Sequence, residues 1–152
     1  MGTRANFDVD LSGLTTSTTN YTAGDQLGTL ITVASFFTGA GATTTIRGAT
    51  LIDGSKVLGP VDVFFCQASV TLAADNAANS LATGDAANVI GSLSFGGQIA
   101  AANISFAEAN AGLPLELNGT ATSLYVAFVT RSANVFFTAS RTQRLRLRVE
   151  KF

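Results

Sequence analysis

The side chains that most often do chemistry in proteins are scarce in this sequence. It contains no histidine and a single cysteine, Cys66. Because Ser-His-Asp and Cys-His nucleophile systems and HExxH zinc sites all need an imidazole, the composition excludes each of them. One cysteine permits neither an internal disulfide nor a thiolate metal cage. Cys66 follows the apolar run Val63-Phe64-Phe65, so we expect a small buried side chain there rather than a reactive thiol.

Two groups of acidic residues could hold a cation. The segment from Asp8 to Gly13 resembles the start of an EF-hand loop, but Thr19 occupies the twelfth loop position, where a bidentate acid is needed. Asp75, Asn76 and Asp85 could supply oxygen ligands, yet helix caps and Asx turns use the same residue types. Since no acid–base set stands out among the acids, we expect no enzyme activity, no metal and no cofactor.

Basic residues are concentrated near the end of the chain. Residues 131–152 contain six basic residues and one acidic residue, whereas residues 1–130 contain three basic and nine acidic ones. Arg144, Arg146 and Arg148 alternate with apolar residues, so in a strand they would share one face and repel one another. Together with Arg141, they are our candidate contact surface for a partner or a sister subunit.

Three interpretations of these arginines are open. They could dock an acidic or phosphate-bearing partner, because the rigid guanidinium fork pairs well with carboxylates. They could instead belong to a solvated edge strand whose charges block aggregation. Nucleic acid is the least favoured partner, because the net charge of the chain is −1 and no aromatic residue is interleaved with the arginines.

The composition describes a thinly charged chain. Of the 152 residues, 47% are apolar but only 12% are charged, against a usual charged share of roughly 25%. A single domain of this size can bury a core without disulfides or metals. We therefore expect a surface of Thr, Ser, Asn and Gly, partly buried against other subunits. No apolar stretch approaches the ~20 residues of a membrane span, and no hydrophobic signal segment follows the first methionine, so we expect neither membrane insertion nor secretion by that route.

β-Branched and aromatic runs separated by Gly and Asn predict strands rather than amphipathic helices. The expected strands cover residues 27–37, 43–52, 61–66, 89–95, 124–130 and 144–149, with 134–138 as a continuation past a short turn. Gly48 predicts a bulge in the second strand. Asp53-Gly54 predicts a hairpin between residues 51–52 and 57–58. The apolar strand over 61–66 is expected to be central.

These elements predict an all-β fold. Seven or eight short strands with turn signals about every ten residues favour a single-domain antiparallel β-sandwich, jelly-roll-like. Leu72 to Thr83 predicts a helical turn or loop capped by Asp75. The Thr- and Ser-rich residues 15–22 predict an extended N-terminal arm or edge segment over residues 1–22, ahead of a β-sandwich domain over residues 23–152.

Motifs in the middle of the chain resemble a known family. They are Tyr21-Thr22-Ala23-Gly24-Asp25 followed by Gly28, then Leu51-Ile52-Asp53, Val61-Asp62-Val63-Phe64-Phe65, Asp75-Asn76-Ala77-Ala78, Thr83-Gly84-Asp85-Ala86 and Val89-Ile90-Gly91. In this order they resemble small structural proteins of tailed bacteriophages, among them capsid decoration (cement) proteins. The resemblance covers about residues 21–93 and consists of turns and core strands. Asn79 departs from the family's pattern, which has an apolar aromatic residue there.

The resemblance implies a β-sandwich subunit that binds the outer face of an icosahedral phage shell, commonly as a homotrimer. Such a subunit clamps neighbouring copies of the major capsid protein against the internal pressure of packaged DNA. The implied location is the outer surface of the virion capsid, after synthesis in the host cytoplasm, with no direct contact to nucleic acid or a membrane. From the resembling segment we add Tyr21 and Asp25 to the candidate interface residues.

Two functions of other classes are alternatives. A head-fibre or tail adhesin domain would bind host surface glycans, but the aromatic residues of this chain lie mostly in core-like runs and Trp, the usual sugar platform, is absent. A jelly-roll lyase, hydrolase or cupin-like enzyme would need an acid–base set or histidine ligands, which the sequence does not offer.

Overall fold

The structure is a computed structural model, and it describes residues 2–10, 20–54, 60–81, 83–96, 99–100, 105–132 and 143–152. Within these ranges the chain forms nine strands and one short 3-10 helix. The elements in chain order are β1 (Thr3–Asp10), β2 (Gln26–Val33), β3 (Thr43–Asp53), β4 (Val61–Cys66), η2 (Thr83–Asn88), β5 (Val89–Phe95), β6 (Ile99–Ala100), β7 (Ser105–Glu116), β8 (Leu124–Thr130) and β9 (Gln143–Lys151).

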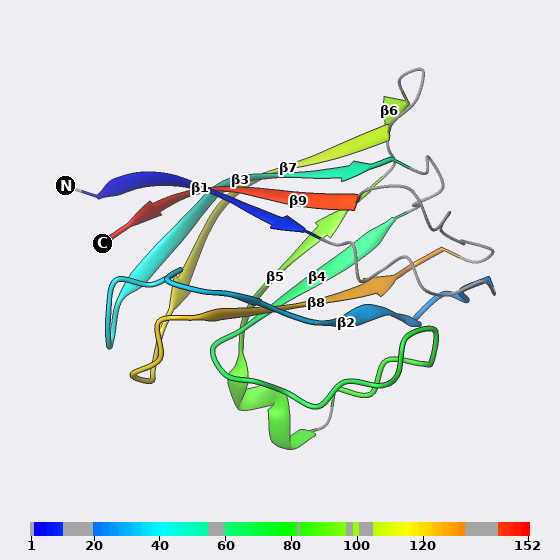
Figure 1. Cartoon of the computed structure of the whole chain (residues 1–152), viewed down its shortest axis with the longest axis horizontal. Coiled ribbons are helices and arrows are strands. Elements are labelled where there is room, and N and C mark those ends of the chain that lie inside the picture. Colours follow the sequence, from blue (N-terminus) through cyan, green and yellow to red (C-terminus); the bar gives the residue numbers. More distant parts are fainter. Residues whose placement is uncertain are drawn as a thin grey trace.

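The strands form two antiparallel sheets that pack face to face (Figure 1). The five-stranded sheet has the order β1-β9-β3-β7-β6, and the four-stranded sheet has the order β2-β8-β4-β5. The pairs β1–β9, β2–β8, β3–β7 and β4–β5 nest inside one another along the chain. Nested pairing of this kind, wound across two sheets, is the jelly-roll topology. The predicted all-β, jelly-roll-like sandwich is therefore confirmed.

Strand β9 lies inside the five-stranded sheet, hydrogen-bonded to β1 on one edge and to β3 on the other. Leu145, Leu147 and Val149 on this strand are buried at 3% exposure or less. The arginines between them point away from the core, as the alternation predicts. The interpretation of this segment as an edge strand is wrong, because both of its edges are already paired.

The core lies between the sheets and draws on residues from almost every strand. Its largest fully buried side chains include Tyr21, Phe36, Phe65, Phe95 and Phe128. The chain leaves β2 at Val33 rather than continuing to Phe37 as predicted. Ser35 has a φ of 55°, which breaks the extended conformation and turns Phe36 and Phe37 into the core.

The bulge predicted at Gly48 is confirmed. The register of β3 against both β7 and β9 shifts between Ile46 and Gly48. The hairpin predicted at Asp53-Gly54 is not formed by β3, because β7 and β9 occupy both edges of this strand as far as Asp53. Residues 57–58, its expected second strand, lie outside the described residues, as do residues 134–138.

Three strands were not predicted, and one of them is the two-residue strand β6. Residues 3–10 form β1 at the edge of the five-stranded sheet, within the segment set apart as an arm or edge segment, while residues 11–19 lie outside the described part. Strand β7 is the longest of the described strands, with 12 residues, although its sequence contains Ala, Asn, Gly and Pro. Such residues have low β-propensity, so this strand owes its conformation to pairing with β3.

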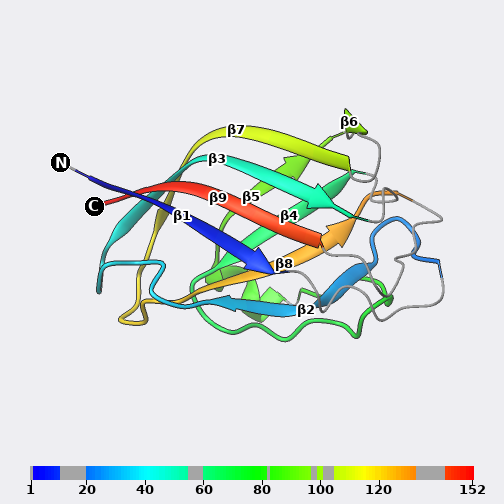
Figure 2. The same cartoon turned by 45° about the horizontal axis from the view of Figure 1, so that its top comes forward.

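The connection between β4 and β5 covers the outer face of the four-stranded sheet (Figure 1). Ala127 and Val129 alternate with the core residues of β8, yet they are also buried. Backbone hydrogen bonds tie this connection to the sheet, since Gln26 N donates to Ala77 O at 2.8 Å and Asn76 N donates to Gln26 O at 3.0 Å. No described segment crosses the outer face of the five-stranded sheet (Figure 2).

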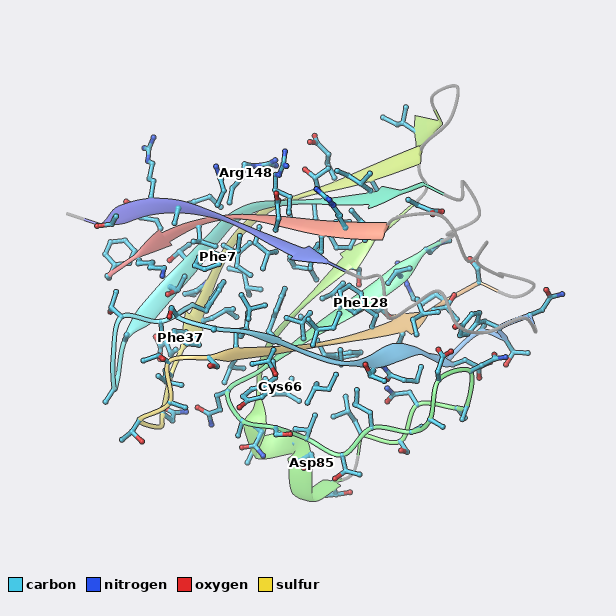
Figure 3. The ribbon with its side chains drawn as sticks, viewed as in Figure 1. Phe7, Phe37, Cys66, Asp85, Phe128 and Arg148 are labelled. Carbon is cyan, nitrogen blue, oxygen red and sulfur yellow. The ribbon has the colours of Figure 1, made fainter. Side chains whose placement is uncertain are left out.

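Cys66 is fully buried at the end of β4, which confirms its expected structural role. It lies on the η2 side of the four-stranded sheet, toward Asp85 (Figure 3). Burial, with a smaller contribution from the Asp85 carboxylate, raises the pKa of the Cys66 thiol from 9.0 to about 11. The thiol therefore stays protonated in the folded chain at pH values where it ionises in the unfolded chain.

This pKa shift predicts a loss of stability between about pH 9 and pH 11, because only the unfolded state releases the thiol proton there. From pH 8 to pH 10.5, the free energy of unfolding of the native chain should fall by up to about 2 kcal/mol more than that of Cys66→Ala. Chemical denaturation of both proteins at the two pH values measures this difference. Equal pH dependence in the two proteins would contradict the assigned burial.

Candidate functional site

The outer face of the five-stranded sheet, which no described segment crosses (Figure 2), carries charged residues from neighbouring strands. Asp8 on β1 and Arg146 on β9 are direct register partners. Arg146 Nε donates to Asp8 Oδ1 at 2.7 Å, and Nη2 donates to Oδ2 at 3.1 Å. The hydrogen bond from Arg146 holds the pKa of the Asp8 carboxyl below its usual value. Asp8 is thus engaged by an arginine in this structure.

Arg148 reaches from β9 across β3 towards β7. Its Nη1 donates to Thr50 Oγ1 at 3.0 Å, and its Nη2 lies 3.9 Å from Glu108 Oε1. The guanidinium lies over Gly48, where an added Cβ would come within 2.7 Å of Nη2. Figure 3 shows Arg148 projecting from the outer side of the sheet, away from Phe7 and Phe128. The glycine at the bulge therefore provides the space that Arg148 occupies.

A third ion pair lies further along the same face. Arg47 Nε donates to Glu150 Oε2 at 2.9 Å, and Arg47 Nη2 contacts the same oxygen. The expected mutual repulsion of neighbouring arginines is therefore corrected, since Arg146 and Arg148 both lie beside acidic residues. Arg144 is exposed and stands opposite Asp10 in the register. Arg141 lies outside the described residues.

A shallow groove of about 720 Å³ opens on this face. The residues that line it are Arg4, Ala5, Asn6, Arg47, Arg148, Val149 and Glu150. Among the described residues that line the groove, three are arginines and one is acidic. Arg4 is exposed and joins no salt bridge within the described part of the chain.

Tyr21 and Asp25 lie elsewhere, in a hydrogen-bonded unit that we call the lock. In the lock, the segment from Tyr21 to Gly28 meets the segment from Ala74 to Asn79. Tyr21 Oη donates to Asp75 Oδ1 at 2.7 Å, and Gly28 N donates to the same oxygen at 2.6 Å. Asp25 forms a β-bridge with Ala78 and accepts hydrogen bonds from the backbone N and Oγ1 of Thr22. The structure does not bring Tyr21 and Asp25 together with the arginines.

The lock also corrects the role expected for Asp75. Residues 72–81 form no helix, so Asp75 caps none; its carboxylate joins two distant parts of the chain instead. Asn79 Nδ2 donates to Gln26 Oε1 at 2.9 Å, and Asn79 N donates to Gly24 O at 2.9 Å. The residue that departs from the family pattern thus joins the same unit through polar contacts.

The sequence contained a pattern, missed above, that predicts the strand β1 and its part of the outer face. In β1, the polar residues Arg4, Asn6 and Asp8 alternate with Ala5 and Phe7, which is the period of a half-buried strand. Glu108 and Thr50 had no such signal for their role, because their partner Arg148 comes from a distant part of the chain. Among the described residues, no group of three or more His, Cys, Asp or Glu side chains gathers as a metal site.

No protein-family model and no curated protein matches the chain. A chain from a solved structure of Desmodium yellow mottle tymovirus is similar in structure, with a TM-score of 0.35 and 13% sequence identity over 99% of this chain and 86% of that chain. At that TM-score the likeness carries no inference about function, and the jelly-roll assignment stands on the strand order. No helix in the described ranges is both long and apolar enough to span a membrane.

Gly48→Ala should displace the Arg148 guanidinium, because the new Cβ would lie within 2.7 Å of it. Arg148 should lose its hydrogen bond to Thr50, at a cost of about 1 kcal/mol in the free energy of unfolding. A crystal structure of the variant and chemical denaturation measure the two effects. Gly39→Ala is the matched control, because open space surrounds Gly39. An unmoved Arg148 in the Gly48→Ala structure would refute this packing.

Asp75→Ala should destabilise the fold by about 2–3 kcal/mol, because it removes the charged acceptor of two hydrogen bonds. Tyr21→Phe removes only one of those two donors and should cost about 1 kcal/mol. Asp75→Asn keeps an acceptor oxygen in place, so its loss should fall below that of Asp75→Ala. Urea unfolding of the three variants measures the series. Native stability in Asp75→Ala would show that the lock does not hold the fold together.

Proposed function

We propose that this chain is a capsid decoration protein of a tailed bacteriophage. It would bind the outer face of the icosahedral shell and stabilise contacts between major capsid protein subunits, as a homotrimer and without enzyme activity. The observation that carries the proposal is the lock. The motifs that resemble the phage family are about fifty residues apart in sequence, yet Tyr21, Asp25 and Gly28 meet Asp75 and Ala78 through direct contacts.

These contacts support the resemblance because they give the matched motifs a common structural role. Here they attach the connection between β4 and β5 to the start of β2. The matched positions thus contribute to one structural unit of this chain, and this common role supports the resemblance and the function proposed from it.

The outer face of the five-stranded sheet, free of any crossing segment among the described residues (Figure 2), supports a docking role in particular. The chain's own connection covers the outer face of one sheet, whereas ion pairs from four strands cover the outer face of the other. Alternating positive and negative side chains on a β-sheet form a surface that a complementary protein can match pair by pair. Weak contacts of this kind become strong when a trimer repeats them on a shell.

The proposal predicts that the purified chain forms trimers and binds intact shells of the phage that encodes it. Analytical ultracentrifugation should give three times the 15.6 kDa chain mass. Co-sedimentation with shells should retain the protein, and a low-resolution map of the particle should show it on the outer surface. Shells that lack it should break at a lower temperature.

The alternatives predict different results in the same experiments. A tail or head-fibre adhesin would bind host surface glycans on an array and would be absent from the shell in the map. An enzyme would turn over a small molecule. A monomer that never sediments with shells would refute the decoration role.

A further inference from the structure

The groove beside β1 carries more positive charge than its own residues neutralise. Arg47 already forms a salt bridge with Glu150, the one acidic residue among the described residues that line the groove. The side chain of Glu150 is 17% exposed, whereas that of Arg148 is 41% exposed. Arg4 is exposed and has no salt bridge in the described ranges. Two guanidinium groups thus face solvent at the groove without a full carboxylate partner.

The groove stays open because the arginine side chains on either side of it extend in other directions. Arg148 extends over Gly48 to Thr50, away from β1. Arg47 turns towards Glu150. Asn6, the register partner of Arg148 on β1, remains exposed beside the gap. The space over the junction of β1 and β9 therefore stays open, between Arg4 and Arg148.

We propose that this groove receives carboxylate side chains from an acidic segment of the protein partner, with Arg4 and Arg148 as the residues that bind them. This inference rests on the proposed function and names the chemistry of its contact. Arginine pairs with carboxylates through two parallel hydrogen bonds, so the groove selects planar anions rather than neutral polar groups.

The surrounding charges favour a protein over a nucleic acid. Asp8, Glu108 and Glu150 are interspersed among the arginines of this face. A nucleic acid presents a continuous row of phosphates, which would meet these carboxylates as well as the arginines. A protein segment can place single carboxylates against single arginines and avoid that repulsion.

The test uses the full chain, labelled with ¹⁵N, and a hexaglutamate peptide with blocked ends, at constant ionic strength. Backbone amide shifts should change in a saturable way at Ala5, Asn6, Gly48 and Val149. Arg4→Gln and Arg148→Gln should each lower the affinity for the peptide about tenfold. This is the loss expected for one charge-assisted hydrogen-bonding contact. Arg4→Gln breaks no salt bridge of the described chain, so it tests the groove even if Arg148→Gln lowers stability.

Arg144→Gln is the matched control, because Arg144 lies on β9 like Arg148 but is not among the residues that line the groove. The substitution removes one positive charge, as the two groove variants do. Its affinity for the peptide should stay within twofold of the native protein. An equal loss in Arg144→Gln and Arg4→Gln would overturn the proposal in favour of unspecific charge attraction. Tighter binding of hexathymidylate than of hexaglutamate at these amides would overturn the choice of a protein partner.

Shell binding then separates this inference from the proposed function. Arg4→Glu with Arg148→Glu should release the protein from shells that retain the native chain and the Arg144→Glu variant. If the native chain itself does not bind shells, the decoration role is refuted. The peptide titration then still decides whether the groove binds carboxylates. If the double variant binds shells as well as the native chain does, the groove is not the contact and the decoration role stands.

Discussion

Strand β9 is the element on which the rest of the structure depends. It is paired along both edges, and one of its faces is apolar whereas the other is charged. Its leucines and valine close the core, and its arginines supply the cations of the outer face. Because β1 and β3 both pair with it, a change of one residue in its register would exchange the two faces and bury the arginines. The core and the charged face are therefore fixed by the same strand register.

The two sheets differ in what covers their outer faces. The connection between β4 and β5 lies on the four-stranded sheet and buries side chains such as Cys66 and Ala127, which alternate with the core residues of their strands. A single carboxylate, that of Asp75, anchors this connection to Tyr21 and Gly28. A partner that binds through a sheet face would therefore meet the five-stranded sheet, where the salt bridges Arg47–Glu150, Asp8–Arg146 and Arg148–Glu108 lie.

Those ion pairs contribute little to stability, and they set the charge pattern of the outer face. Pairs with partly exposed side chains, such as Asp8–Arg146, typically add little to the free energy of folding, because water already solvates both charges. Their fixed positions on a rigid sheet give a defined pattern of positive and negative groups. Gly48 extends that pattern, since the missing side chain lets Arg148 lie flat across β3 towards Thr50 and Glu108.

The sequence by itself determined the fold class, the two faces of β9, the burial of Cys66 and the bulge at Gly48, because each depends on residue type and on a period of two along one strand. It left β7 unpredicted, because its Ala, Gly and Pro residues become a strand only through pairing with β3. It also gave no sign that Asp75 would meet Tyr21, or that Arg148 would meet Glu108. Only the tertiary structure decided those contacts, because the order of strands in a sheet brings together residues from distant parts of the chain.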